Sequence, residues 1–196
     1  MSSSRAELRT LTRQRRRALS AAEQLQAASA LAAQLLSWPQ LAQCQQIALY
    51  LTNDGEISTQ PLLHALWAAG KTLHLPVLHP VVPGYLLFQQ FSADTPLRLN
   101  KFAIGEPQLN CSQLTPVQQL DLILTPLVAF DALGNRLGMG GGFYDRTLSQ
   151  LKPDASRPLL MGLAHQCQQV PQVPVEAWDQ PLSYIATPEK IWQFSQ

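Results

Sequence analysis

A long apolar run, LDLILTPLVAFD at residues 120–131, leads directly into a glycine-rich loop, GNRLGMGGGFYDR at residues 134–146. A run with so few polar positions is typical of a strand that is buried on both faces of a sheet. Such strands occur in parallel sheets covered by helices, so this segment favours an α/β fold. The loop holds five of the ten glycines of the chain. Glycine in such a cluster needs a reason, either unusual backbone angles or a ligand close to the main chain.

The rest of the chain alternates between strand-like and helix-like segments. Apolar runs predict strands over residues 46–52, 72–78, 85–91, 120–131, 158–165 and 183–187, with 85–91 nearer an edge of the sheet. Periodicity and capping residues predict helices over 5–17, from Ser20 to Pro39, from Ser58 or Thr59 to Gly70, over 143–152, and from Thr187. Residues 92–118 show little periodicity and are expected to be loop with short pieces of structure. We therefore predict one three-layer α/β/α domain over residues 1–196, with a mainly parallel sheet.

Composition limits the class of protein. A chain of 196 residues with 46% apolar content can bury one substantial core. Its formal net charge of +1 gives no general attraction to nucleic acid or anionic membrane. No apolar run approaches the roughly 18 residues of a membrane span. Cys44, Cys111 and Cys167 are far apart, which favours a reducing compartment without disulfides or a zinc site. We expect a cytoplasmic monomer with no nucleic-acid or membrane partner.

The first twenty residues are strongly basic. Six of the fourteen Lys and Arg residues lie here, with only Glu7 against them. Such a segment fits a solvated helix, an arm that binds nucleic acid, or an organelle transit peptide. Arg15 and Arg16 are expected to lie in solvent. A helix would align every fourth arginine along one side, namely Arg5, Arg9, Arg13 and Arg17.

The glycine loop stands between a predicted strand and a predicted helix, an arrangement that binds phosphate through free backbone N–H groups and the helix dipole. It is no Walker A loop, because no Gly-Lys-Ser/Thr follows Gly142, and Phe143 stands where a dinucleotide fingerprint has its third glycine. A sharp turn alone would also explain the glycines. However, Arg136 and Arg146 can neutralise phosphate, and Asp145 can hold a Mg²⁺ that bridges phosphate oxygens. The loop therefore favours a phosphate ligand.

The segment GNRLGMGGGFYDR closely resembles the signature of the 5-formyltetrahydrofolate cyclo-ligase family, also called 5,10-methenyltetrahydrofolate synthetases. The likeness runs along nearly the whole chain, from a basic first helix with LR and RR.AL, through a strand ending in GEI, to a late VPVEAWDQPL. It implies conversion of 5-formyltetrahydrofolate and MgATP to 5,10-methenyltetrahydrofolate, ADP and phosphate. It also implies a fold related to the ribose-5-phosphate isomerase and CoA-transferase group.

The resemblance assigns roles to residues by motif. It implies that the first helix and the glycine loop hold ATP, through Arg5, Ala6, Glu7, Leu8, Arg9, Arg136, Leu137, Gly138, Met139, Gly140, Gly141, Gly142, Phe143 and Tyr144. It implies that the folate lies against Leu51, Glu56, Met139, Gly140, Gly141, Gly142 and Phe143. Mg²⁺ is assigned to Asp145 and Asp179, and the predicted catalytic residues are Arg136 and Tyr144.

The chemistry implied by the resemblance suits these residue types. An N-formyl group is a poor electrophile until its oxygen is phosphorylated, after which N10 of the folate can attack the carbon. Phosphoryl transfer needs positioning and charge neutralisation, which arginines, backbone N–H groups and a metal supply. No nucleophilic side chain is required. The scattered histidines are expected to be packed or on the surface, namely His64, His74, His79 and His165.

Two other functions stay open. An isomerase or transferase of the same fold group, acting on a phosphosugar or CoA ester, would need a catalytic carboxylate and no ATP. The basic first helix and Asp145 favour ATP. A nucleic-acid-binding protein could use the arginine-rich start, but the remainder of the chain is neutral and lacks interleaved aromatic residues. Cleavage of a transit peptide would remove Arg5 and Arg9.

Overall fold

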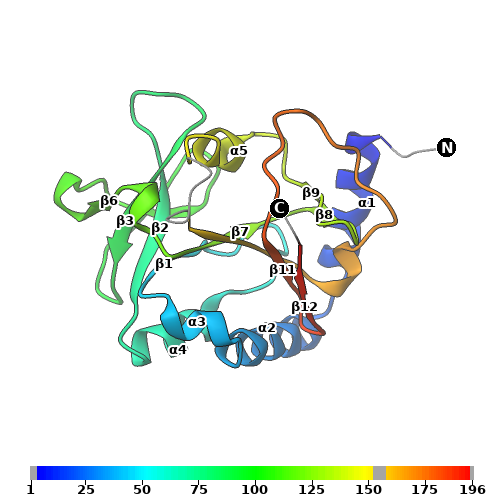
Figure 1. Cartoon of the computed structure of the whole chain (residues 1–196), viewed down its shortest axis with the longest axis horizontal. Helices are drawn as coiled ribbons and strands as arrows, with labels where there is room; N and C mark the ends of the chain where they lie inside the picture. The colour runs from blue at the N-terminus through cyan, green and yellow to red at the C-terminus, as the bar shows by residue number, and fades with distance from the viewer. Residues whose placement is uncertain (1–3, 152–157, 195–196) are drawn as a thin grey trace.

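The computed structural model describes residues 4–151 and 158–194, and an eight-stranded sheet runs through its centre (Figure 1). The strand order is β12-β11-β10-β7-β1-β2-β3-β6. Pairings from β11 to β2 are parallel, whereas those of β12, β3 and β6 are antiparallel. The strands are β1 (Gln46–Ala48), β2 (Thr72–Leu78), β3 (Leu86–Phe91), β6 (Leu114–Thr115), β7 (Leu122–Pro126), β10 (Leu159–Leu163), β11 (Tyr184–Ala186) and β12 (Ile191–Gln193). The predicted α/β fold with a mainly parallel sheet is confirmed.

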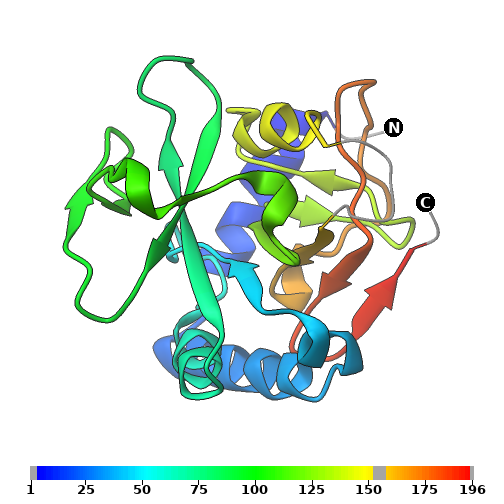
Figure 2. The ribbon, with the colours of Figure 1, turned by 60° about the vertical axis from the view of Figure 1, so that its left-hand side comes forward.

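Helices cover both faces of this sheet (Figures 1 and 2). One face carries α2 (Ala21–Leu36), α3 (Pro39–Gln43) and α4 (Gln60–Ala68). On the other side lie α5 (Phe143–Leu148) and α1 (Arg5–Arg17), the latter beside the small sheet of β8 (Ala129–Phe130) and β9 (Arg136–Leu137). A second small sheet pairs β4 (Leu97–Leu99) with β5 (Gly105–Pro107). Short 3₁₀ turns cover Cys111–Gln113, Val117–Gln119 and Gln166–Gln168.

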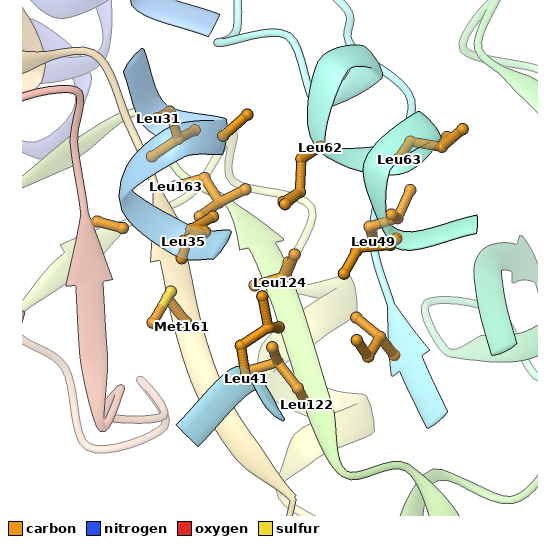
Figure 3. Close-up of a cluster of buried hydrophobic side chains, with 14 of the residues drawn as sticks. Leu31, Leu35, Leu41, Leu49, Leu62, Leu63, Leu122, Leu124, Met161 and Leu163 are labelled. Carbon is orange, nitrogen blue, oxygen red and sulfur yellow. The ribbon is translucent and has the colours of Figure 1, made fainter. Parts of the chain in front are cut away.

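The core lies on both faces of the sheet, as the composition of β7 requires. Leu122 and Leu124 point into the cluster beneath α2, α3 and α4, which Figure 3 shows. Ile123, between them, belongs to the cluster on the opposite face. Successive side chains of a strand point to opposite faces, so a strand buried on both sides must be apolar throughout. None of the helices in the described parts of the chain combines the length and apolar character that crossing a bilayer requires.

The predicted starts of α2 and α4 are confirmed. Ser20 caps α2, because its hydroxyl accepts from the Glu23 amide and the Glu23 carboxylate accepts from the Ser20 amide at 2.8 Å. Thr59 precedes α4, but its hydroxyl donates to the carbonyl of Tyr50 at 2.7 Å and does not cap the helix. That bond ties the start of α4 to the segment that follows β1.

The prediction of one strand over residues 120–131 is wrong. The strand ends at Pro126, and Ala129 and Phe130 pair with β9 in a separate sheet. Side chains satisfy the carbonyls at the break: that of Leu127 accepts from Arg16 and Gln168, and that of Val128 from Gln168. A proline cannot donate to a strand ladder, and these carbonyls have partners elsewhere, so the strand stops. The β8–β9 hairpin then leads to the glycine loop.

The predicted C-terminal helix from Thr187 is also wrong. The Thr187 hydroxyl accepts from the amides of Glu189 and Lys190, both at 3.3 Å, and the Thr187 amide donates to the Lys190 carbonyl. These bonds form a tight turn into β12, which pairs antiparallel with β11. Trp192 of β12 packs edge-on against Phe130, with ring centroids 5.3 Å apart. Packing of this partly buried ring favours a hairpin over a helix.

Two elements are shorter than predicted. The strand expected over residues 46–52 is regular only over Gln46–Ala48, although Leu49 still donates to the carbonyl of His74. The helix expected over residues 143–152 ends at Leu148, and residue 152 lies outside the described residues.

Candidate active site

A cavity of about 600 Å³ opens where β1, β2 and β7 end. The β4–β5 hairpin and the glycine loop form its other walls. Most lining side chains are apolar, while a few polar groups such as Glu56, Arg136, Tyr144 and Asp145 converge on the cavity. A concave site of this size with a few fixed polar groups is the usual form of a small-molecule binding site.

The segment after β1 forms a tight turn that places Glu56 in the cavity wall. Asp54 and Gly55 both have positive φ, 53° and 72°, and the Glu56 amide donates to the Asn53 carbonyl at 3.0 Å. The Glu56 carboxylate accepts from the Asn53 amide at 3.1 Å. Burial raises the pKa of Glu56 to about 7, against the opposing effect of Arg16. Leu51, the other predicted folate contact outside the loop, also lines the cavity.

The glycine loop packs against two arginines, and two of its glycines have positive φ angles. Gly140 has φ 98°, and a Cβ added there would lie 3.4 Å from the guanidinium carbon of Arg9. Gly142 has φ 64°, and an added Cβ would lie 2.7 Å from Nη1 of Arg146. Glycine adopts such angles at no steric cost. At residue 142 a side chain would also press on the guanidinium group of Arg146, whereas at residue 140 the contact with Arg9 would be ordinary. The loop is therefore shaped by its backbone and by close packing, with no bound ligand needed to explain it.

Helix α1 lies alongside the loop, as the resemblance implies. The Nε of Arg9 donates to the carbonyl of Gly138 at 2.9 Å. The Leu8 side chain is buried with Leu137 in a small apolar cluster, and Glu7 completes the capping box of α1 with Ser4. Ala6 is exposed. Within residues 5–9, the guanidinium group of Arg9 therefore faces the glycine loop, and that of Arg5 faces Asp179.

Arg146, predicted to neutralise phosphate, instead acts as a link between backbone segments. Its Nε donates to the carbonyl of Gly84 at 2.9 Å, and its Nη2 donates to the carbonyl of Gly141. It also lies over the ring of Phe143, 5.8 Å from the centroid. The ring of Phe102, at the tip of the β4–β5 hairpin, meets Phe143 edge-on at 5.6 Å. The loop is thus fixed to the β2–β3 hairpin and to the β4–β5 hairpin.

Arginines occupy both aspartates to which the resemblance assigns Mg²⁺. Asp145 Oδ1 accepts from Arg136 at 2.5 Å and from the Gln180 amide at 3.2 Å. Asp179 accepts from Arg5 at 2.6 and 2.9 Å. Burial raises the pKa of Asp179, but the hydrogen bonds from Arg5 and the Glu176 amide, with the charges of Arg5 and Arg136, together lower it. Among the residues that the structure describes, no three His, Cys, Asp or Glu side chains cluster as a metal site would.

Arg136 is the most buried of the predicted catalytic residues, with 4% of its side chain exposed. Burial lowers its pKa, although Asp145 opposes that effect. Its Nε is buried without a hydrogen-bond partner in the described part of the chain. An orphan donor of this kind is costly, so a bound acceptor at this position would be favoured. Tyr144 lines the same cavity, and burial raises the pKa of its phenol.

The cavity gathers some predicted residues and leaves others outside. Its lining includes the predicted residues Leu51, Glu56, Arg136, Gly138, Met139, Gly141, Gly142, Phe143, Tyr144 and Asp145. The lining does not include Arg5, Ala6, Glu7, Leu8, Arg9, Leu137, Gly140 and Asp179. The sequence analysis missed the β4–β5 hairpin, because no periodic signal marks residues 92–118.

The prediction that Arg16 lies in solvent is wrong. This residue was expected in solvent beside Arg15, yet its side chain is fully buried, whereas Arg15 is exposed. Its partner Asp54 stands in an Asp-Gly pair, and such a pair marks a tight turn in sequence. The Asp-Gly pair predicts the turn, but it does not predict that Arg16 binds this turn.

The histidines are packed or on the surface, as predicted for residues without a catalytic role. His165 is buried, and burial together with nearby Arg16 lowers its pKa to about 4. His74 is buried in β2, where its Nε2 lies 2.9 Å from the hydroxyl of Thr115. Neither residue lines the cavity.

Comparison with known proteins gives a consistent result. Residues 1–188 match the model of the 5-formyltetrahydrofolate cyclo-ligase family. The 5-formyltetrahydrofolate cyclo-ligase of Escherichia coli K12 is 45% identical over 184 residues, covering 94% of this chain and 100% of that protein. The enzyme of the same name from Haemophilus influenzae is 48% identical over 178 residues, covering 91% and 94%.

A solved structure shows the same fold. The NMR structure of Aquifex aeolicus 5,10-methenyltetrahydrofolate synthetase superposes with a TM-score of 0.83 at 29% identity, covering 98% of this chain and 93% of that one. The sequence match, the shared fold and the glycine loop beside the cavity agree: this chain belongs to the 5-formyltetrahydrofolate cyclo-ligase family of enzymes.

Proposed function

We propose that this protein uses ATP, in the presence of Mg²⁺, to convert 5-formyltetrahydrofolate to 5,10-methenyltetrahydrofolate, with release of ADP and phosphate. The observation that carries the proposal is the position of the glycine loop. One part of it lines the cavity that holds Glu56, and the Gly138 carbonyl binds Arg9 of α1. A folate in the cavity and a polyphosphate near α1 would then meet at this loop.

The proposed reaction has two steps that balance. The formyl oxygen attacks the γ-phosphorus of ATP, the bond to the β-phosphate oxygen breaks, and ADP leaves. N10 of the folate then attacks the formyl carbon and loses its proton. The C–O bond breaks, phosphate leaves, and a methenyl bridge joins N5 and N10. Neither step needs a nucleophilic side chain, so positioning and charge neutralisation account for the contribution of the protein.

Arg136 and Tyr144 are the residues we assign to this charge neutralisation. The unpartnered Nε of Arg136 is a buried donor beside the cavity and would bind an oxygen of the phosphoryl group in transfer. Because burial raises the pKa of Tyr144, its phenol stays protonated and can donate a hydrogen bond. Both side chains would thus act as donors toward developing negative charge.

The proposed Mg²⁺ would share its ligands between the protein and the nucleotide. Mg²⁺ in phosphate-transfer enzymes is commonly bound by one or two carboxylates plus substrate phosphates. Asp145 and Asp179 are the carboxylates we assign to it, and both are engaged by arginines. When bound, the ion would neutralise phosphate oxygens. Arg5 and Arg136 hold the two carboxylates in place for it.

The folate would occupy the cavity. Glu56 offers a buried carboxylate that can accept hydrogen bonds from the N–H groups of a pterin, and Leu51 and Phe143 offer apolar contact. We propose further that residues 1–196 form one domain that works as a cytoplasmic monomer.

The test is an absorbance assay for methenyltetrahydrofolate. Product should form only when 5-formyltetrahydrofolate, ATP and Mg²⁺ are all present, and EDTA should abolish the reaction. Turnover without ATP would contradict the ligase proposal and would favour an isomerase or transferase of related fold.

A further inference from the structure

Arg16 is buried completely in a helix whose neighbouring arginines are exposed. None of its side chain reaches solvent, while Arg15 and Arg17 are exposed. Taking a guanidinium group out of water is costly unless it is paired and hydrogen-bonded, so its partners indicate why it is there. Without these partners, a charged group would be left uncompensated inside the protein.

The partners of Arg16 come from two walls of the cavity. Its Nε donates to the carbonyl of Asp54 at 2.9 Å, and its Nη2 donates to Asp54 Oδ2 at 2.9 Å. Its Nη1 donates to the carbonyl of Leu127 at 3.2 Å, at the break between β7 and β8. Asp54 and Leu127 both line the cavity. Arg16 therefore joins α1 to both walls without entering the cavity itself.

The bonds to Asp54 fix the turn that orients Glu56. Asp54 has φ 53°, a conformation that costs a non-glycine residue energy unless its surroundings hold it. Arg16 binds both the carbonyl and the carboxylate of that residue. Glu56 follows two residues later, with Oε2 on the Asn53 amide and Oε1 4.0 Å from Arg16 Nη2. The guanidinium group thus reaches Glu56 both through the turn and directly through space.

We propose that Arg16 is a positioning residue for the reaction, which holds the Glu56 carboxylate in place and keeps it negatively charged for folate binding. The inference rests on the proposed function, in that it takes the cavity as the folate site. It adds a residue that does not touch substrate and acts through another residue.

The electrostatic surroundings of Glu56 agree with this role. Burial raises its pKa to about 7, Arg16 lowers the pKa, and the Asp54 carboxylate raises it. These two charges therefore act on Glu56 in opposite directions. A neutral residue at either position should move the ionisation of Glu56 in a direction that can be predicted in advance.

Two phenols and one imidazole near Glu56 carry no charge near neutral pH. Burial raises the pKa values of Tyr50, which precedes the turn, and of Tyr144 in α5, so both phenols stay protonated. The pKa of His165 is lowered to about 4, so its imidazole stays neutral. Arg13 and Arg17 direct their guanidinium groups to the Asp54 carboxylate. Arg16 is therefore the cation that forms the direct ion pair with Glu56.

The test measures kcat/KM for 5-formyltetrahydrofolate against pH at saturating MgATP, because this profile reports ionisation of the free enzyme. Activity should fall below about pH 7 as Glu56 is protonated. Arg16→Met should move this fall to higher pH by roughly one unit, the least effect expected of an opposite charge at this distance. Arg16→Lys, which keeps the charge, should stay near the parent profile. Asp54→Asn should move the fall to lower pH, and asparagine suits the positive φ.

Controls separate this role from a general effect on stability. Arg15→Met removes an exposed charge from the same helix and should leave the profile unchanged. Glu56→Gln should remove the fall near pH 7. Thermal melts establish that each variant is folded under assay conditions, and if Arg16→Met does not fold, Arg16→Gln, which keeps hydrogen-bond donors but removes the charge, takes its place. An unmoved profile in the folded variants would overturn the role of Arg16, whereas absence of product in the parent protein would overturn the proposed function itself.

Discussion

Glu56 and Arg136 both line the cavity, with side chains that are 11% and 4% exposed. Burial of either charged side chain costs free energy, because an ionised group loses most of its hydration inside a protein. Glu56 has a pKa raised by burial, and Arg136 has a donor without a partner. Such perturbed groups in one cavity are typical of functional sites. At the scale of the residue, the cavity therefore contains one acceptor and one donor ready for a ligand.

Glu56→Gln should separate binding of the two substrates. The amide keeps the size of the side chain but replaces a carboxylate oxygen with an NH₂ group, which cannot accept a hydrogen bond from a pterin N–H. Loss of a hydrogen bond to a charged group corresponds to roughly 1.5–3 kcal/mol, or about one to two decades in affinity. We therefore expect the KM for 5-formyltetrahydrofolate to rise at least tenfold on that scale, with little change for ATP. Steady-state kinetics with each substrate varied in turn provides the measurement, and equal losses for both would show that Glu56 does not face the folate.

Helix α1 is the element that reaches both sides of the proposed site. Arg9 binds the glycine loop through the Gly138 carbonyl, and two turns later Arg16 binds the Asp54 turn. Residues four apart lie along one side of a helix, and the side chains of Arg5, Arg9, Arg13 and Arg17 all point to partners far along the chain. The helix thus holds the loop and the turn in a fixed relation.

Arg9→Ala should weaken ATP binding selectively. A charge-assisted contact to phosphate is worth roughly 1.5–3 kcal/mol, so the KM for ATP should rise about tenfold or more. The matched control is Arg15→Ala, because Arg15 is exposed on the same helix, where substitutions usually change stability by less than about 0.5 kcal/mol. Arg16 cannot serve as this control, since it is fully buried. Equal KM values for ATP in the two variants, at matching thermal stability, would exclude α1 from the ATP site.

The elements that the sequence predicted well are those with a local signal. Helix α2 begins after the Ser20 capping box, and β2 covers the predicted residues 72–78. Where a prediction of secondary structure was wrong, the reason is a contact with a residue distant in sequence. The strand at 120–131 breaks where Arg16 and Gln168 bind its carbonyls, and the turn at Thr187 leads into a strand because Trp192 packs on Phe130.

The residues of the candidate site likewise include some that the sequence predicts and some that only the tertiary fold reveals. The glycine loop with Asp145 and the Asp-Gly turn are visible as motifs, and the resemblance implied the roles of Glu56 and Asp179. The burial of Arg16 could not be predicted from the sequence. A run of arginines is expected to lie in solvent, and the partners of Arg16 lie far away along the chain. The pairing of Asp145 with Arg136 and of Asp179 with Arg5 was equally hidden. Both depend on the tertiary fold.

At the scale of the whole molecule, the parallel sheet brings distant segments together at one edge. The ends of β1, β2 and β7 meet at the cavity, and the loops that follow them carry its functional groups. Ligands of α/β sheets usually bind at the carboxyl ends of the strands, where these loops lie. On this arrangement we base the proposal that the formyl oxygen of the folate and the γ-phosphate of ATP meet at the glycine loop.

The most direct test of that claim follows the formyl oxygen. The protein would be incubated with MgATP and 5-formyltetrahydrofolate labelled with oxygen-18 in the formyl group, and the phosphate released would be analysed by mass spectrometry. Phosphorylation of the formyl oxygen predicts that each phosphate carries one labelled oxygen, with ADP, phosphate and methenyltetrahydrofolate formed in equal amounts. Unlabelled phosphate alongside formation of the methenyl product would contradict the account.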